Sequence, residues 1–199
     1  MKTFRTTALV LIAFNFLTGC DPNDPAPPPL PSCTTVNSDF TQLFAATLAS
    51  NSVFDDYTNM DLLTHEYTFS VATNETVCAV GYQGNAVLFA NNIPYTVEIF
   101  DNTNNALVYS GSHFFDSAFT DYQSVIPTNL VAGNTYTIRR IVTNYMGNIG
   151  TTTGRILRFN GSNPYPVTTN GLTITASDFY GTGGPVTNYG IPYIDIIFQ

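Results

Sequence analysis

The chain has 199 residues with 14 acidic and six basic side chains, which gives a formal net charge of −8 at pH 7. This balance excludes nucleic acid as a partner, because a protein that binds phosphates needs a basic surface to displace their counterions. The length is sufficient for one sizeable domain with a hydrophobic core.

The N-terminus has the pattern of a bacterial export signal. Lys2 and Arg5 precede an apolar stretch at residues 8–17, which is too short to cross a bilayer as a stable helix. The stretch ends in Leu17-Thr18-Gly19-Cys20, and this run resembles the lipobox of bacterial lipoproteins. The resemblance implies that residues 1–19 are a signal peptide, cleaved before a lipid-bearing Cys20. A secretory signal that happens to end near a cysteine is the alternative.

The lipobox also implies a place in the cell envelope. Cleavage removes Lys2 and Arg5, leaving four cations against 14 acids and a net charge of −10. Such a protein gains nothing from anionic lipid, so we expect membrane contact through acyl chains on Cys20 alone. Asp21 follows that cysteine. An acidic residue there holds lipoproteins at the inner membrane in some bacteria and exports them to the surface in others. We favour the outer membrane or cell surface.

Residues 21–32 read DPNDPAPPPLPS. Proline fixes its own backbone and biases the preceding residue toward extended conformations, so this segment is predicted to be a spacer and not part of a core. At about 3.1 Å per residue it would hold the domain roughly 35 Å from the lipid headgroups. Together with Cys20 it forms the predicted tether, residues 20–32.

Cys33 and Cys78 remain when Cys20 carries lipid. An even pair in an oxidising compartment predicts a disulfide, with two unpaired cysteines as the alternative. The loop-entropy relation gives such a bridge a stabilisation of about 4 kcal/mol. Metal binding by the pair is not expected, since no further cysteine or histidine cluster completes a tetrahedral site.

Residues 33–199 are predicted to form a single all-β domain. Period-2 alternation dominates, as in Tyr67, Phe69 and Val71, and turns rich in Gly, Asn and Pro separate the strands. A helix is expected only at residues 39–49, with Ser38 as its cap, and an edge strand is the rival there. The expected fold is an antiparallel β-sandwich, either Greek-key and immunoglobulin-like or jelly-roll-like. The expected strands are residues 66–72, 76–82, 95–99, 106–110, 122–126, 135–143, 155–160, 172–176 and 193–198.

One local pattern supports this fold class. Leu130-Val131-Ala132-Gly133-Asn134-Thr135-Tyr136 resembles the tyrosine corner of Greek-key sandwiches such as fibronectin type III and immunoglobulin-like domains. More broadly, residues 95–142 resemble uncharacterised β-sandwich domains of secreted bacterial proteins. That resemblance implies an extracellular accessory module without catalysis, and it assigns no functional residues.

Catalytic patterns are weak throughout the sequence. Ser112, His113 and Asp116 are sequence neighbours, but no nucleophile elbow surrounds the serine, and a solvated loop is expected there. A glycoside hydrolase would need two carboxylates across a cleft, and nothing places such a pair among Asp55, Asp56, Asp61 and Glu66. We therefore expect no enzyme, and we keep an envelope glycoside hydrolase as a third reading.

The charged clusters have structural interpretations. Residues 55–61 supply oxygens that suit calcium but lack the spacing of an EF-hand, so a plain turn is expected, with no metal and no cofactor. The four arginines of the mature chain fall on two strands that we expect to be neighbours. They can clamp an anion or pair with acids of the same fold, and the acidic surplus favours pairing. They are Arg139, Arg140, Arg155 and Arg158.

Tyrosines in the C-terminal loops are the candidate ligand-binding residues. Tyr165, Tyr180 and Tyr189 lie among Gly, Asn, Ser and Pro, a composition typical of binding loops. They stand outside the alternating pattern, so the core has no evident use for them. The competing interpretation is that they plug the ends of the sandwich, and the lack of tryptophan weakens a carbohydrate-binding role.

Taken together, the sequence predicts a lipid-anchored envelope lipoprotein that acts as a non-catalytic structural, adhesive or interaction module. A surface glycan-binding lipoprotein that uses the tyrosine-bearing loops is the alternative. The expected partners are the membrane, through Cys20, and either a glycan or another envelope protein.

Overall fold

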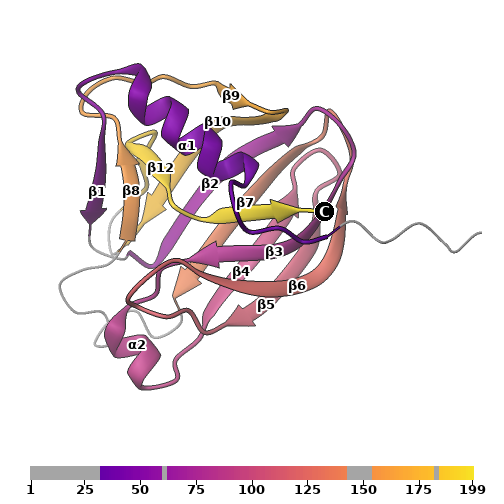
Figure 1. The fold of residues 1–199 in the computed structure, drawn as a ribbon, viewed down its shortest axis with the longest axis vertical. Coiled ribbons are helices and arrows are strands. Elements are labelled where there is room, and N and C mark those ends of the chain that lie inside the picture. Colours follow the sequence, from indigo (N-terminus) through magenta and orange to yellow (C-terminus); the bar gives the residue numbers. More distant parts are fainter. Residues whose placement is uncertain (1–31, 60–61, 143–153, 182–183) are drawn as a thin grey trace, which may run out of the picture. The chain divides into compact units, whose positions relative to one another are not determined.

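The computed structural model describes residues 32–59, 62–142, 154–181 and 184–199. These residues form an antiparallel β-sandwich with one long and one short helix (Figure 1). The signal peptide, Cys20 and the tether up to residue 31 lie outside the described residues. The elements in chain order are α1 (Asp39–Ser50), β1 (Asp55–Asn59), β2 (Thr64–Val71), β3 (Glu75–Tyr82), α2 (Ala86–Ala90), β4 (Tyr95–Asp101), β5 (Ala106–His113), β6 (Asp121–Leu130), β7 (Thr135–Val142), β8 (Gly154–Arg158), β9 (Val167–Thr169), β10 (Leu172–Tyr180), β11 (Val186–Thr187), β12 (Gly190–Pro192) and β13 (Asp195–Phe198).

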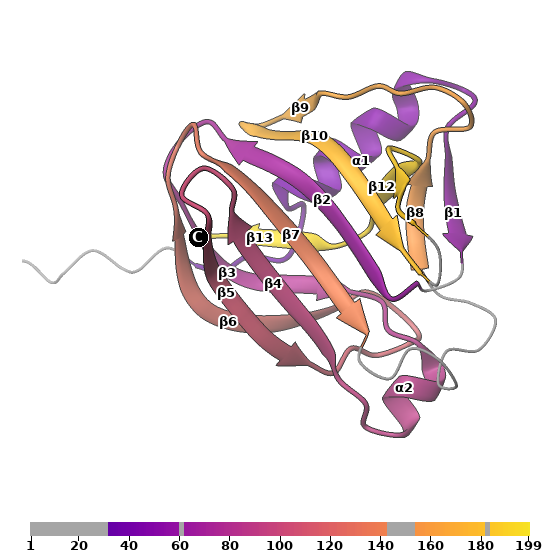
Figure 2. The same ribbon diagram turned by 180° about the vertical axis from the view of Figure 1, so that it is seen from behind.

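The larger sheet has seven strands. Six follow the order β11-β10-β2-β7-β4-β5, and β9 pairs with β10. Burial alternates strictly along β2 and β4, so that one face of the sheet is apolar and the other is polar. The sheet is seen from its outer side in Figure 2. The alternation that predicted these strands is therefore confirmed.

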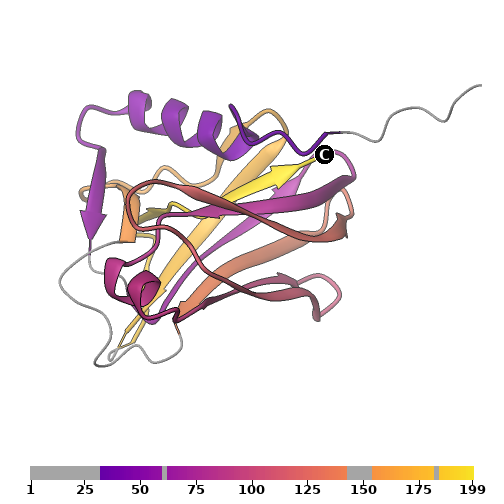
Figure 3. The same ribbon diagram turned by 60° about the horizontal axis from the view of Figure 1, so that its bottom comes forward.

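The second layer contains the three-stranded sheet β13-β3-β6, which faces the larger sheet (Figure 3). Another three-stranded sheet, β1-β8-β12, lies beside it. The chain passes from the larger sheet to β3 and back to β4, and again from β5 through β6 to β7. These crossings bury one continuous core between the layers, which confirms the predicted β-sandwich.

Helix α1 forms where the period changes from 2 to 3.6. The side-chain oxygen of Ser38 accepts a 3.0 Å hydrogen bond from the backbone N–H of Thr41, which caps the helix. Phe40, Leu43 and Phe44 are buried on one face, and each contributes roughly 1.5–3 kcal/mol by leaving water. The predicted helix is confirmed, and the rival edge strand is wrong.

The connection from β6 to β7 is a tyrosine corner, as the sequence predicts. The ring of Tyr136 is buried at the start of β7. Its hydroxyl oxygen accepts a 2.7 Å hydrogen bond from the backbone N–H of Val131. Gly133 takes a positive φ of 81° in the turn, where a side chain would be strained. The hydrogen bond fixes the chain where it crosses between the sheets.

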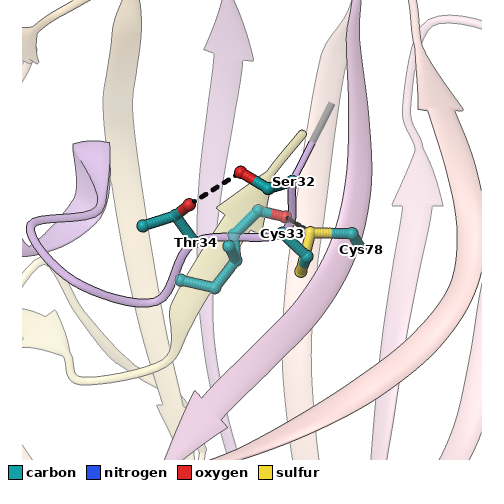
Figure 4. The surroundings of a disulfide bond; sticks show 5 residues. Ser32, Cys33, Thr34 and Cys78 are labelled. Carbon is teal, nitrogen blue, oxygen red and sulfur yellow. Dashed lines mark hydrogen bonds between the residues drawn. A yellow bond between two sulfur atoms is a disulfide. The ribbon is translucent and has the colours of Figure 1, made fainter. Parts of the chain in front are cut away.

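Cys33 and Cys78 form a disulfide, which confirms the predicted pairing. Figure 4 shows the bond joining the segment before α1 to strand β3. The Cys78 sulfur also lies 3.5 Å from the carbonyl oxygen of Ile197 in β13. The start of the domain is therefore bonded covalently to β3, the strand that pairs with the C-terminal strand β13.

Two predictions of local structure are wrong. A helix is expected only at residues 39–49, but a second one, α2, forms at Ala86–Ala90, where Asn85 caps it. The second error is the turn expected at residues 55–61. Residues 55–59 form strand β1 and not a turn, because β1 pairs with β8 along its whole length. Aspartate and asparagine disfavour strands, so the acidic run hid the strand. The pairing with β8 supplies what the local sequence lacks.

Candidate functional site

The strongest candidate site is a hollow of about 400 Å³ beside β8 and β12, hereafter the loop pocket. One wall follows β8 and the other spans β11 and the turn after it. Its lining contains only aromatic, aliphatic, hydroxyl and amide groups, with no charged side chain. The lining residues are Phe159, Gly161, Ser162, Asn163, Val186, Thr187, Asn188 and Tyr189.

The first wall is a tight turn after β8. Asn160 and Gly161 both adopt positive φ, at 46° and 88°. Glycine adopts the left-handed region of positive φ at no steric cost, and asparagine tolerates it. The chain can therefore reverse direction here without strain. The N–H of Ser162 donates to the carbonyl oxygen of Phe159 at 3.1 Å, which closes the turn.

The second wall is held to β10 by Asn188. Its backbone N–H donates to the carbonyl oxygen of Ser177 at 2.7 Å, and its side-chain oxygen accepts from the N–H of Ser177 at 3.0 Å. The N–H of Phe159 donates to the carbonyl oxygen of Tyr189 at 3.1 Å and thus joins the two walls. The loop pocket therefore rests on fixed backbone.

Tyr189 is the aromatic group that the loop pocket offers to solvent. Its side chain is 36% exposed, and its ring meets Phe179 edge-on with centroids 6.3 Å apart. The Arg158 guanidinium forms hydrogen bonds with Asp55 and with Tyr189. Both raise the pKa of Arg158, and the bond with Asp55 has the larger effect. The ring is thus held in place while part of it stays accessible.

The other two candidate tyrosines have different environments. Tyr165 packs edge-on against Phe159, with centroids 5.1 Å apart, and its hydroxyl donates to the carbonyl oxygen of Gly190 at 3.1 Å. Burial raises the pKa of the Tyr165 phenol. The expectation that the core has no use for this residue is wrong, because Tyr165 packs on the core cluster.

Tyr180 ends strand β10 on the outer side of the larger sheet. Its hydroxyl donates to Oε1 of Glu66 at 3.3 Å, and it does not line the loop pocket. The three tyrosines therefore form no common row, and only Tyr189 combines exposure with a concave surface.

Ser112 and His113 lie at the end of strand β5. The solvated loop expected for this pair is therefore wrong. Consecutive residues of a strand point to opposite faces, so the serine is exposed while the histidine is buried. The His113 Nε2 lies 2.8 Å from the Tyr109 hydroxyl, and burial lowers the pKa of the imidazole. In the described contacts the partner of this histidine is the Tyr109 hydroxyl and not Ser112.

The first two candidate carboxylates pair with arginines of β8. Arg158 binds Asp55 through two hydrogen bonds of 3.0 and 2.6 Å. Arg155 binds Asp56 in the same bidentate manner, at 2.9 and 2.7 Å. Asp61 lies outside the described residues. Both oxygens of each carboxylate are therefore occupied by an arginine of β8, and the two acids join β1 to β8.

The two remaining arginines lie on β7, which belongs to a different sheet from β8, so the expected neighbourhood of the two strands is wrong. The Nε of Arg139 lies 3.5 Å from Glu98 and 3.9 Å from Glu66. Arg140 is fully buried and donates to the carbonyl oxygen of Leu62 at 2.7 Å. Pairing within the fold, the favoured interpretation, holds for Arg139, Arg155 and Arg158.

Among the described ranges, no group of three or more His, Cys, Asp or Glu side chains is placed to hold a metal ion. In the same part of the chain, no helix is long and apolar enough to cross a membrane.

No protein-family model matches the chain, and no curated protein matches it. Among solved structures, the chain is similar to "Structure of a family 35 carbohydrate binding module from an environmental isolate", with 18% sequence identity and a TM-score of 0.32. The match covers 67% of this chain and 82% of that chain.

Proposed function

We propose that this protein is a lipid-anchored, non-catalytic binding module of the bacterial cell envelope, and that the loop pocket binds a neutral, hydroxyl-rich ligand, most simply a glycan. The observation that carries the proposal is the partly exposed ring of Tyr189 at the rim of an uncharged hollow. Small-molecule sites combine such apolar surface with a few fixed polar groups.

The lining favours a sugar over an ionic ligand. Hydroxyl and amide side chains both donate and accept hydrogen bonds, which matches the hydroxyl groups of a sugar. Ser162, Asn163 and Thr187 supply these groups, and Tyr189 supplies an apolar face. A charged ligand would be left unpaired in this lining, and desolvating an unpaired charge is costly.

The surrounding structure supports a binding role over a catalytic one. Asp55 and Asp56 are held by bidentate arginines, and His113 is buried against Tyr109. The lipobox at residues 17–20 supports the lipid anchor, and the Cys33–Cys78 disulfide fits an oxidising envelope compartment.

A glycan array followed by calorimetry with the best-binding glycan tests the ligand class. Tyr189→Ala should weaken binding by about 1–2 kcal/mol, or roughly 5- to 30-fold, because it removes the exposed ring. Phe89→Ala is the control, since Phe89 is an aromatic residue of α2 that is 43% exposed and lies outside the pocket. An empty array, or equal losses in both variants, would contradict the proposed ligand site.

A further inference from the structure

A second surface lies across the molecule from the loop pocket. Strand β5 ends the larger sheet opposite β11, and β6 ends the sheet β13-β3-β6. The two strands run along the same side of the sandwich (Figures 2 and 3). We call residues 106–130, which comprise β5, β6 and their connection, the β5–β6 edge.

Large apolar side chains of the β5–β6 edge meet solvent, among exposed serines and an asparagine. Four large hydrophobic side chains are exposed on it: Leu107 at 53%, Phe114 at 46%, Phe119 at 59% and Ile126 at 79%. A groove of about 390 Å³ lies between residues 108–110 of β5 and residues 126–129 of β6. Several large exposed apolar side chains on one edge, with a groove beside them, are features of a site of association.

The edge is also almost free of charge. Its 25 residues contain no lysine, arginine or glutamate, and its charged side chains are Asp116 and Asp121. The mature chain carries a net charge of −10, so two copies repel each other across most surfaces. The β5–β6 edge is where like copies approach with little repulsion.

Strand β5 lacks most of the devices that protect an edge. It contains no proline and no charged residue, and its histidine, His113, is buried. A bulge at Val108 interrupts its pairing with β4, but residues 109–113 keep a regular register. Among the described residues, no backbone hydrogen bond joins the outer side of β5 to another segment.

Strand β6 is protected. Its register with β3 breaks between Val77 and Ala79, Pro127 removes a backbone donor, and the Thr128 hydroxyl occupies the carbonyl oxygen of Ile126. The contrast points to β5 as the strand that accepts a partner.

We propose that β5 pairs antiparallel with β5 of a second copy of this chain, around a two-fold axis near Gly111. A two-fold axis presents the same edge twice, so the exposed backbone groups of both copies are satisfied together. With the axis at Gly111, Leu107 of one copy lies near Phe114 of the partner subunit. The pairing therefore covers the apolar side chains that flank the strand.

Sedimentation velocity of the full chain in density-matched detergent tests the dimer. Leu107→Glu places a charge beside Phe114 of the partner subunit, where it loses water without gaining a counterion. Val53→Glu makes the same charge change at a 48% exposed site between α1 and β1. We expect the wild type and Val53→Glu to dimerise with rising concentration, and Leu107→Glu to need at least a tenfold higher concentration. Because all three keep Cys20, association through the lipid is common to them.

The proposal would be overturned by a wild type that stays monomeric, by a Leu107→Glu variant that dimerises like the wild type, or by an equal loss in Val53→Glu. If Leu107→Glu fails to fold, Ser112→Glu replaces it, since Ser112 is exposed on the same strand. A photo-crosslinker at Leu107 should yield a homodimer, and a crosslink to another protein only would also contradict it. None of these measurements depends on glycan binding. The dimer proposal can therefore be disproved while the proposed glycan site in the loop pocket is retained, and the glycan site can be disproved while the dimer is retained.

Discussion

The hydroxyl of Ser38, which caps helix α1, donates a 2.7 Å hydrogen bond to Oδ1 of Asp195 in β13. The other carboxyl oxygen of Asp195 accepts a 2.9 Å hydrogen bond from the Tyr122 hydroxyl of β6. Asp195 is fully buried, and burial raises the pKa of its carboxyl to about 6 even though both hydrogen bonds favour the charged form. One carboxyl thus joins α1, β6 and β13.

We predict that Asp195 stabilises the fold more at acidic than at neutral pH. Its pKa is about 6 in the folded protein and close to 3.8 when unfolded, so the native state retains the proton between these values. The contribution is complete below about pH 4 and is lost as the pH rises through about 6. Two pH units correspond to about 3 kcal/mol. The free energy of unfolding of the wild type minus that of Asp195→Asn, from urea titrations, should fall by that order between pH 4 and pH 8.

Asp101 provides the control of opposite sign. Burial acts to raise the pKa of its carboxyl, but hydrogen bonds from Asn104 and Asn134 together hold that pKa below its usual value. Its stabilisation is present above the unfolded pKa and is lost on acidification. The free energy of unfolding of the wild type minus that of Asp101→Asn should therefore decrease as the pH is lowered. Two differences that are flat, or that share a sign, would contradict these assignments.

Removing the corner hydroxyl should cost stability without changing the fold. Tyr136→Phe leaves the N–H of Val131 without its 2.7 Å acceptor, and a typical hydrogen bond contributes about 0.5–1.5 kcal/mol. Urea denaturation should show a loss of that size. Tyr57→Phe, at a 37% exposed ring of β1, is the control and should stay within about 0.5 kcal/mol of the wild type. An unchanged midpoint for Tyr136→Phe would count against the corner.

The disulfide should make a large contribution to stability. It joins residues separated by 45 positions, and closing a loop of that size in the unfolded chain stabilises the fold by about 4 kcal/mol. Replacing Cys33 and Cys78 together by serine should lower the free energy of unfolding by up to that amount. Reductant should have the same effect on the wild type and none on the double variant. Two thiols that alkylate readily in the native, unreduced protein would rule the bridge out.

The sequence predicted those parts of the fold that follow from local periodicity. Alternation marks β2 and β4, and the 3.6 period with a serine cap marks α1. β1 escaped prediction because it forms by pairing with β8, about 100 positions later in the chain, and such pairing leaves no local pattern. Tyr165 was misjudged for the same reason, since its contacts with Phe159 and Gly190 depend on how two loops meet.

The lipid anchor is a separate prediction, because Cys20 lies outside the described residues. The lipobox at residues 17–20 predicts that Cys20→Ala moves the protein from the detergent phase to the aqueous phase when a detergent lysate is partitioned. Substituting Cys33 instead removes a cysteine without touching the lipobox and should leave the protein in the detergent phase. A Cys20→Ala variant that remains membrane-bound would show that another feature anchors the chain.

The three C-terminal tyrosines should separate when each is replaced by alanine. Tyr165→Ala removes a ring that packs on Phe159 and a hydroxyl bonded to Gly190, so a loss of about 2–4 kcal/mol in the free energy of unfolding is expected. Tyr189→Ala truncates a ring that is 36% exposed and should lower stability by less than about 1 kcal/mol while it weakens ligand binding. Tyr180→Ala removes a half-buried surface contact with Glu66 and should change stability little and binding not at all. Thermal melts and calorimetry on the same three variants measure both properties. If Tyr189→Ala destabilises the fold as much as Tyr165→Ala, then Tyr189 is a second plug of the sandwich end, and the loop pocket loses the group on which its ligand would stack.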